Sequence, residues 1–366
     1  MTRRIAMINL TTGTKRGGVE TFVIELSKNL ALRGFEVDLY VGDGSITLDL
    51  GEHINIFRLP YTPRERILDL GSRFKKFGER LSFAFHAWPT LKSRRYDYLY
   101  VHKPYDLPLT LFYRYRRGGK VIYSSHGTEF FRGYKRLVSA CNLRLACSRF
   151  NARQVQDYCG LQPEVLYNGV NTKLFAPMAP DEELRKQLGI SEDEHVLFTA
   201  ARLIGWKGIQ YGIAAMAQSR HREKLHYLIA GEGNYRSDLE KKIGELGLED
   251  QVQFIGMLPN EELRRYYSIA DIALYPSVAD ETFGISIAEA MATDTPVITC
   301  NVGGIPEVVG EDSILVPPRS PDHIAAEIDH ILDEGFKGEP RRRIIDNFNW
   351  QKITDHFLRL LEAAQD

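Results

Sequence analysis

Short apolar runs alternate with amphipathic stretches along almost the whole of this 366-residue chain, and they do so in two successive series. Val- and Ile-rich runs that alternate with helices are typical of parallel sheets built from βαβ units. The first series of predicted strands comprises residues 4–10, 36–41, 96–101, 121–125 and 143–147, and the second comprises residues 196–200, 226–230, 252–255, 272–275, 296–299 and 314–316. Helices are predicted between most of them, for example at residues 20–33, 209–216, 236–246 and 261–269.

Two series, each with its own start, predict two doubly wound α/β domains, which also suits the length of the chain. The stretch FAPMAPD at residues 175–181 contains two prolines that would interrupt a helix, so we place the boundary after Phe175. The expected parts are a domain of residues 1–175, a domain of residues 176–345 and a C-terminal segment of residues 346–366 that is largely amphipathic.

Charge is divided unevenly between the two halves. Residues 1–175 hold 28 Lys and Arg against 15 Asp and Glu, a net charge of +13, although the whole chain carries only −1. A basic half predicts an anionic partner for that half. Within it, residues 61–95 interleave basic side chains with large apolar ones, which fits a helix on an anionic membrane surface or an apolar face packed on the domain. No nucleic-acid-binding motif accompanies the segment, so we expect no nucleic acid partner.

Composition excludes several classes of protein. With 43% apolar and 26% charged residues, the chain is neither disordered nor a collagen-like protein. Its apolar runs fall well short of the roughly 18 residues of a membrane-spanning helix, and no signal-like segment precedes the first predicted strand, so we expect a cytoplasmic protein. Four cysteines show no metal-binding or redox spacing and are predicted to be buried free thiols: Cys141, Cys147, Cys159 and Cys300.

The most informative window is residues 277–310, SVADETFGISIAEAMATDTPVITCNVGGIPEVVG. A predicted strand ends just before it, a loop with Glu281, Thr282, Phe283 and Gly284 follows, and residues 286–292 read as a helix. A flexible glycine lets backbone N–H groups approach a ligand, and a helix N-terminus attracts negative charge. The combination predicts a cradle for a diphosphate.

Glu281 and Glu289 flank this cradle. Glu289 lies within the apolar sequence ISIAEAMA, where a carboxylate is costly unless it is paired or hydrogen-bonded. The two hydroxyls of a ribose would supply such hydrogen bonds. The alternative is that the two residues are unrelated surface carboxylates.

The window resembles the glutamate-x7-glutamate motif of the retaining, family-4-type glycosyltransferases of the GT-B fold. The matching residues are Glu281, Phe283, Gly284 and Glu289, followed by Gly303, Gly304, Pro306 and Glu307. Further signatures stand in the family's order: Gly17–Gly18–Val19–Glu20, Asn168–Gly169–Val170–Asn171 with Phe175, Arg202 with Lys207–Gly208, and Gly231–Glu232–Gly233. The resemblance covers essentially the whole chain. It implies two Rossmann-like domains that face each other across a cleft, with the C-terminal helix crossing back to the first domain.

The residues expected to bind the donor are inferred partly from their own chemistry and position and partly from the family resemblance. Arg202 and Lys207 come just after a predicted strand, at the edge where open α/β sheets bind ligands, and the resemblance implies that they grip the donor diphosphate as catalytic residues together with Glu281. The remaining residues expected at the donor are Gly17, Gly18, Gly231, Gly233, Leu258, Thr282, Phe283, Gly284, Ile285 and Glu289. Gly17 and Gly18 do not form the GxGxxG pattern of dinucleotide dehydrogenases.

The first half contributes further candidates at strand ends. His126 precedes Gly127, and the resemblance implies that it contacts a donor-sugar hydroxyl as a catalytic residue; the alternative is a structural hydrogen-bonding role. On the acceptor side we consider Lys15, Arg16, His102 and Glu129.

The resemblance implies a retaining hexosyltransferase that uses a nucleoside-diphosphate sugar, UDP-linked or next GDP-linked. The basic first half favours an anionic or lipid-linked glycan acceptor, such as lipopolysaccharide core or a polyprenyl-linked saccharide, at the cytoplasmic face of the inner membrane. No Asp-x-Asp occurs in the chain, so neither a metal ion nor another cofactor is expected. Alternatives are a non-hydrolysing sugar-nucleotide epimerase, a soluble polysaccharide synthase and a catalytically silent nucleotide-sugar-binding module.

Overall fold

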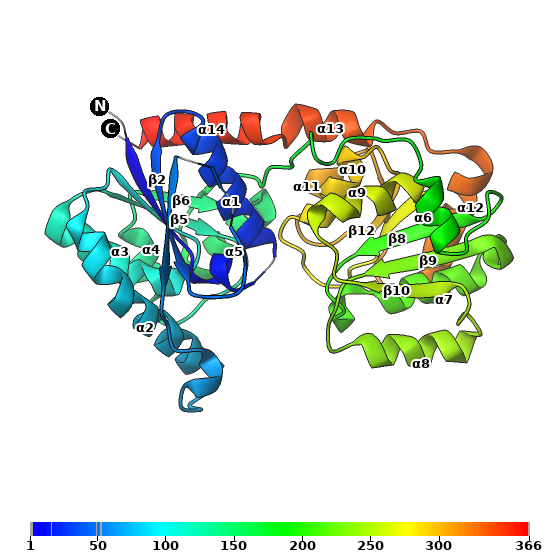
Figure 1. Ribbon diagram of the computed structural model, residues 1–366, viewed down its shortest axis with the longest axis horizontal. Helices are drawn as coiled ribbons and strands as arrows, with labels where there is room; N and C mark the ends of the chain where they lie inside the picture. The colour runs from blue at the N-terminus through cyan, green and yellow to red at the C-terminus, as the bar shows by residue number, and fades with distance from the viewer. Residues whose placement is uncertain (1–2, 16, 49, 52, 365–366) are drawn as a thin grey trace. The chain divides into compact units, whose positions relative to one another are not determined.

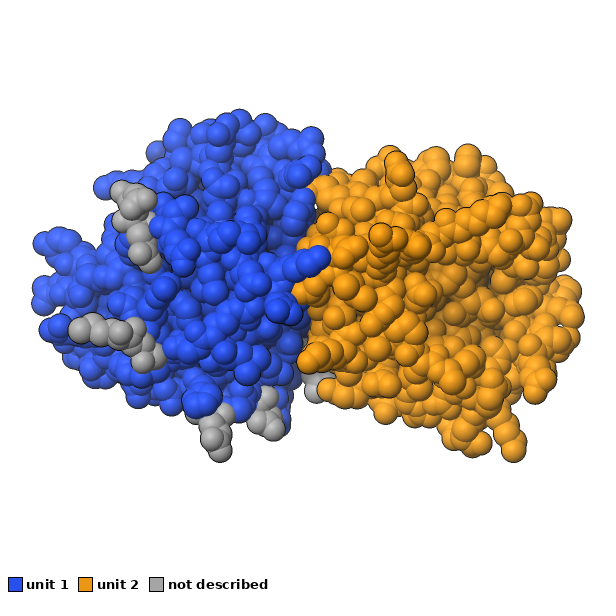
Figure 2. Space-filling view, turned by 90° about the horizontal axis from the view of Figure 1, so that it is seen from above, with its two compact units in different colours: residues 1–169, 350–366 blue, residues 170–349 orange. Residues whose placement is uncertain are grey.

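The computed structural model describes residues 3–15, 17–48, 50–51 and 53–364. The chain forms two compact units, unit 1 with residues 1–169 and 350–366 and unit 2 with residues 170–349 (Figure 2). The boundaries therefore differ from the expected ones at 175/176 and 345/346. Phe175 belongs to unit 2 because its buried ring packs edge-on against Tyr267, with 6.3 Å between ring centroids, and its carbonyl accepts a hydrogen bond from Arg341.

Unit 1 contains a seven-stranded parallel sheet with the order β3-β2-β1-β4-β5-β6-β7. The strands are β1 (Arg4–Ile8), β2 (Glu36–Gly42), β3 (Ile54–Leu59), β4 (Tyr98–Val101), β5 (Lys120–Ser125), β6 (Leu143–Ala146) and β7 (Glu164–Val165). The helices are η1 (Leu10–Gly13), α1 (Gly18–Ala31), η2 (Arg64–Arg66), α2 (Ser72–Ser93), η3 (Pro104–Asp106), α3 (Leu107–Arg117), α4 (Tyr134–Ser139), α5 (Arg149–Cys159) and α14 (Trp350–Ala363).

Helices cover both faces of this sheet (Figure 1). Successive side chains of a strand point to opposite faces, and accordingly Met7 belongs to the core under α1 and α14, whereas Ile8 belongs to the core under α2 and α3. The amphipathic C-terminal segment thus forms α14 and packs within unit 1, where Arg33, two residues beyond the end of α1, pairs with Asp355 at 2.6 Å.

The sequence analysis did not predict two strands of unit 1. β3 reads INIFRL, and as an edge strand it buries few of its side chains, so it lacks the continuous apolar run of a central strand. β7 at the other edge is only two residues long.

Residues 61–95 form η2 and α2, and α2 has two apolar faces. Phe83, Ala87 and Leu91 are buried against unit 1, whereas Leu81 and Phe85 are 57% and 77% exposed. No helix among the described residues is both long enough and apolar enough to cross a membrane. The four cysteines are buried free thiols, as predicted.

Unit 2 contains a six-stranded parallel sheet with the order β10-β9-β8-β11-β12-β13. The strands are β8 (His195–Ala200), β9 (Leu225–Ala230), β10 (Val252–Gly256), β11 (Ile272–Tyr275), β12 (Val297–Cys300) and β13 (Ile314–Val316). The helices are α6 (Glu182–Gln187), η4 (Gly205–Lys207), α7 (Ile209–Gln218), η5 (Arg222–Lys224), α8 (Arg236–Leu246), α9 (Asn260–Ile269), α10 (Ile285–Ala292), α11 (Ile305–Val309), α12 (Pro321–Glu334) and α13 (Pro340–Asn347).

Both sheets reverse their strand order once, between β1 and β4 in unit 1 and between β8 and β11 in unit 2. The predicted doubly wound α/β class is thereby confirmed. Ligands of such sheets bind at the carboxyl ends of the strands, in the crevice at the point of reversal. This rule directs attention to the loops that follow β1 and β4 in one unit and β8 and β11 in the other.

Candidate functional site

Lys207 and Glu281 form an ion pair at the reversal point of unit 2. Lys207 ends η4 in the loop after β8, and Glu281 lies in the loop after β11; the Lys207 ammonium contacts Glu281 Oε2, and less than a fifth of either side chain is exposed. The same ammonium lies 4.7 Å from the centre of the Trp206 ring, a favourable position for a cation. The structure thus brings together two residues that the sequence analysis assigned to one site.

Backbone contacts fix these two loops against each other. Val278 N donates a hydrogen bond to the Trp206 carbonyl at 2.9 Å. Gly208, with φ of +75°, approaches the end of β11 so closely that a Cβ atom would lie 1.8 Å from the Pro276 carbonyl oxygen. Only glycine fits this position, because both the φ angle and the contact exclude a side chain.

Gly303 and Gly304, in the loop after β12, contact the backbone of Glu281. Gly304 N donates to the Glu281 carbonyl at 2.7 Å, and a Cβ on Gly303 would lie 2.3 Å from the same oxygen. Loops from three neighbouring strands, β8, β11 and β12, therefore converge on Glu281.

Helix α10 starts at Ile285 directly after Gly284, whose φ is +87°. Glu289 lies one turn further on and is buried, with 7% of its surface exposed. Burial raises the pKa of its carboxyl to about 8, and no ion pair from the described part of the chain offsets this cost. A buried carboxyl with no ion-pair partner among the described residues is the arrangement expected of a group that receives hydrogen bonds from a ligand.

The remaining donor candidates of unit 2 follow three adjacent strands, β8, β9 and β10. A Cβ on Gly231 would lie 1.9 Å from the Ala201 carbonyl oxygen and one on Gly233 2.1 Å from the Leu203 carbonyl oxygen, so the loops after β8 and β9 lie against each other. Arg202, between those two contact points, has an exposed side chain.

Three further candidates differ in how much of them is accessible. Leu258, beyond the end of β10, and Thr282 are half-buried. Phe283 is buried against Phe348, with 5.6 Å between ring centroids, so its ring packs within unit 2 and is not available to a ligand.

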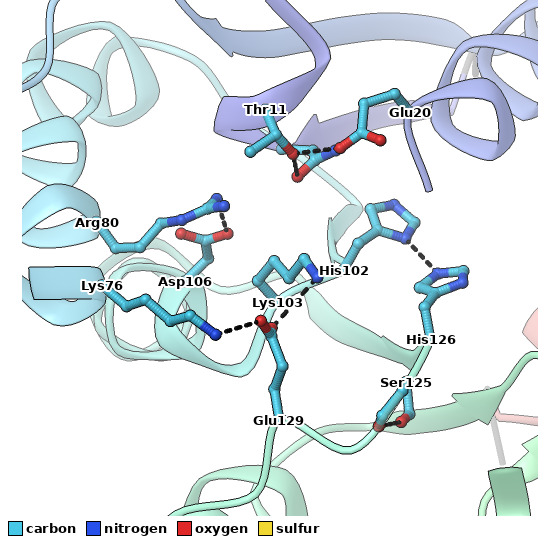
Figure 3. Close-up of polar contacts among 12 residues, drawn as sticks. Thr11, Glu20, Lys76, Arg80, His102, Lys103, Asp106, Ser125, His126 and Glu129 are labelled. Atoms are coloured by element: carbon cyan, nitrogen blue, oxygen red, sulfur yellow. Dashed lines mark hydrogen bonds and ion pairs between the residues drawn. The ribbon is translucent and has the colours of Figure 1, made fainter. Parts of the chain in front are cut away.

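At the carboxyl edge of unit 1, the two histidines that follow β4 and β5 lie together (Figure 3). His102 Nδ1 lies 3.1 Å from His126 Nε2, and both rings pack edge-on against Phe22 of α1. Burial lowers the pKa of His126 to about 3 and that of His102 well below its ordinary range, so both are neutral near pH 7. One ring donates and the other accepts the hydrogen bond between them. His102 Nε2 is buried and has no hydrogen-bond partner among the described residues.

The glycine-containing loop after β1 carries a polar cluster (Figure 3). Thr11 Oγ1 lies within hydrogen-bonding distance of Asn9 Oδ1, at 3.1 Å, and of a carboxylate oxygen of Glu20 in the first turn of α1. Gly17 precedes this helix, and a Cβ there would lie 2.7 Å from Glu20 Oε2. Gly18 is the first residue of α1, Lys15 is exposed, and Arg16 lies outside the described residues.

Glu129 is held between two lysines, Lys76 of α2 at 3.0 Å and Lys103 at 3.2 Å (Figure 3). Burial would raise the pKa of Glu129, but the two cations outweigh it and lower the pKa to about 2. Neither lysine was predicted to belong to the site, although Lys103 directly follows His102 at the end of β4. Within the described residues, no group of three or more His, Cys, Asp or Glu side chains is placed to hold a metal ion.

Comparison with known proteins finds a family match for each half of the chain. Residues 16–174 match the family described as Glycosyltransferase Family 4, and residues 180–349 match the family described as Glycosyl transferases group 1. An uncharacterized glycosyltransferase of Methanocaldococcus jannaschii is 31% identical over 255 residues, which span 66% of this chain and 64% of that protein.

Solved structures share the fold over nearly the full length. Sucrose-phosphate synthase from Thermosynechococcus elongatus superimposes with a TM-score of 0.85 at 23% identity, covering 99% of this chain and 98% of that one. The Anabaena protein HepE, solved in complex with UDP and glucose, gives 0.81 at 23% identity, covering 98% of this chain and 99% of the other. The two family matches and the two doubly wound sheets identify the chain as a GT-B glycosyltransferase of group 1, an enzyme that transfers a sugar from a nucleotide sugar.

Proposed function

We propose that this enzyme is a retaining hexosyltransferase that transfers a hexose to an anionic or lipid-linked glycan without a metal ion. The favoured donor is a UDP-sugar, and a GDP-sugar is the second choice. The observation that carries the proposal is the Lys207–Glu281 pair at the reversal point of unit 2. It presents a fixed cation at the edge where a doubly wound sheet binds its ligand.

The donor would be held by unit 2. Arg202 and Lys207 neutralise the diphosphate together with the backbone N–H groups at the start of α10, and these fixed charges take the place of a metal ion. Glu289 accepts hydrogen bonds from the ribose hydroxyls, which would offset its burial. Gly231, Gly233 and Leu258 border the base. The complex of HepE with UDP and glucose supports a UDP-sugar as the first donor to test.

In the proposed reaction the acceptor oxygen attacks the anomeric carbon on the same face from which the leaving diphosphate departs. The bond between the acceptor oxygen and the anomeric carbon forms as the bond from that carbon to the diphosphate oxygen breaks, and the acceptor proton passes to the departing phosphate. The transition state has oxocarbenium character. Positioning and charge stabilisation then supply most of the acceleration. Neutral His126 would hold a sugar hydroxyl near the anomeric carbon.

The acceptor would be held by unit 1. The net charge of +13 over residues 1–175 favours an anionic molecule. Leu81 and Phe85 of α2 project from the unit, and they lie on the same helix as several lysines and arginines. Apolar and basic side chains on one helix suit contact with an anionic membrane, which would place the enzyme at the cytoplasmic face of the inner membrane.

A donor panel tests the proposal. UDP- and GDP-hexoses are each incubated with the enzyme and EDTA, first alone and then with glycolipid extract. We expect UDP to raise the melting temperature and one UDP-hexose to be hydrolysed slowly alone and transferred when extract is present. Configuration at the new bond is read by NMR. Binding without turnover would instead indicate a catalytically silent binding module. Conversion of the donor to another sugar nucleotide would indicate an epimerase, and transfer to neutral chain ends would indicate a polysaccharide synthase.

A further inference from the structure

A groove on unit 1 lies beside the carboxyl edge of its sheet, in the unit proposed to hold the acceptor, and is not used by the donor site. It has a volume of about 370 Å³ and runs between α2, η3 and the segment that leads into α4. Phe77, Tyr105 and Phe131 form its aromatic walls, and the rings of Tyr105 and Phe131 stack with 4.8 Å between centroids. This volume and this lining are typical of sites for small apolar ligands.

One wall of the groove continues into an apolar stripe on α2. Phe74, Phe77, Leu81 and Phe85 follow one another at helical spacing and are 43%, 45%, 57% and 77% exposed. They occupy the side of α2 away from the buried face that contains Phe83. A contiguous exposed apolar surface of this kind marks a binding site, and here it leads directly into the groove.

The groove also carries positive charge. Arg73 and Arg132 belong to its lining. An occupant with an apolar body and an anionic end would satisfy both the aromatic walls and these cations.

We infer that this groove binds the hydrocarbon chain of a phosphorylated lipid, with the phosphate at Arg73 and Arg132. The inference rests on the proposed function, since the lipid is then the carrier of the acceptor glycan. A second copy of the chain fits less well, because a two-fold contact through the groove would bring the same arginines of both copies together. The acceptor class is thereby narrowed from anionic glycans in general to glycans on a lipid phosphate.

Calorimetric titration of the full-length enzyme with farnesyl phosphate, below the concentration at which it forms micelles, tests the inference. We expect saturable binding that Phe77→Ser weakens at least about tenfold, because the buried part of one large apolar side chain accounts for a difference of that size. Phe74→Ser, at a second lining position, should weaken it in the same direction. Leu32→Ser is the matched control, since Leu32 is 83% exposed in the same unit and does not line the groove.

Two further ligands separate the chain from the phosphate. Farnesol should bind more weakly than farnesyl phosphate, and Arg132→Gln should reduce this difference; inorganic phosphate alone should bind far more weakly than either. Equal affinities of wild type and Phe77→Ser for farnesyl phosphate would overturn the inference. So would a dimer in ultracentrifugation that Phe77→Ser dissociates, since the groove would then belong to a second copy.

A parallel thermal-shift measurement with UDP keeps this test distinct from that of the proposed function. If UDP stabilises wild type and Phe77→Ser equally while farnesyl phosphate binds neither, the groove assignment fails and the donor site stands. If farnesyl phosphate binds as described and no nucleotide does, the groove stands and the proposed transfer reaction fails.

Discussion

Lys207 and Glu281 are 74 residues apart in the chain, yet their side chains pair at the point where the strand order of unit 2 reverses. The pair holds an ammonium group in place before any donor arrives. A fixed charge of this kind stabilises a leaving diphosphate without a further cost of reorganisation at the moment of reaction.

Lys207→Ala should therefore lower kcat with a UDP-hexose by at least about a hundredfold, the scale found when one preorganised charge-stabilising group is removed. Steady-state kinetics with the donor found in the panel measure the effect. Lys224→Ala is the control, because Lys224 also pairs with a carboxylate in unit 2, Asp193, but is largely exposed. A turnover of Lys207→Ala close to that of the control would remove Lys207 from the catalytic site.

Glu289 should make the stability of the ligand-free enzyme depend on pH. Burial raises the pKa of its carboxyl from 4.5 to about 8, so the folded state retains a proton that the unfolded state releases between these values. The stabilisation is complete below pH 4.5 and is lost as the pH rises to about 8, by on the order of a few kcal/mol. Urea unfolding at pH 5 and pH 8 should show a larger loss for wild type than for Glu289→Gln.

The same carboxyl links donor binding to protons. Ribose hydroxyls that donate to Glu289 favour its ionised form, so UDP binding near pH 7 should release a proton. Calorimetry in two buffers of different ionisation enthalpy measures the release. Equal proton release by wild type and Glu289→Gln would show that Glu289 does not contact the nucleotide.

Gly303 and Gly335 provide a matched pair of glycines. Both have positive φ, +59° and +78°, but a Cβ on Gly303 would meet the Glu281 carbonyl oxygen at 2.3 Å, whereas one on Gly335 would meet nothing within 4 Å. Gly335→Ala should cost only the strain of the backbone, on the order of 1–3 kcal/mol. Gly303→Ala should cost more and should also displace Glu281, so that UDP affinity falls at least about tenfold. Unchanged UDP affinity of a folded Gly303→Ala variant would contradict this account.

His102 should act by positioning His126. His102→Phe keeps an aromatic ring beside Phe22 but removes the nitrogen that lies 3.1 Å from His126 Nε2. Loss of one hydrogen bond should lower kcat by roughly tenfold. The affinity for UDP should not change, because UDP binding is assigned to unit 2. A lower UDP affinity with an unchanged kcat would contradict both assignments.

Much of this fold could be predicted from local patterns. Helix α8 was predicted at residues 236–246, where it is found, because its apolar residues recur at helical spacing. The central strands are buried on both faces and therefore appear as apolar runs. β3 could not be found this way, since an edge strand that contacts one neighbour needs fewer apolar residues.

The candidate site was predictable where its residues follow one another closely, as in the loop from Glu281 to Ile285. Contacts between distant loops were not predictable in the same way. The His102–His126 contact arises because β4 and β5 are neighbours in the sheet. The ion pair between Glu129 and Lys76 forms because α2 brings Lys76 close to Glu129. Such contacts depend on strand order and helix placement, which no local spacing encodes.

The exposed side chains of α2 lead to a prediction about membranes. The double variant Leu81→Ser/Phe85→Ser removes two large apolar groups that are mostly in contact with solvent, so the fold should retain its melting temperature. Wild type should sediment with vesicles that contain anionic lipid and less with neutral ones, since the helix also carries lysines and arginines.

The variant should lose most of its binding to the anionic vesicles, because the apolar groups supply the part of the affinity that charge alone does not. High salt should weaken the binding of wild type as well, because it screens the basic residues. Equal, weak sedimentation of wild type with both kinds of vesicle would exclude membrane contact through α2 and would favour an acceptor that reaches the enzyme from solution.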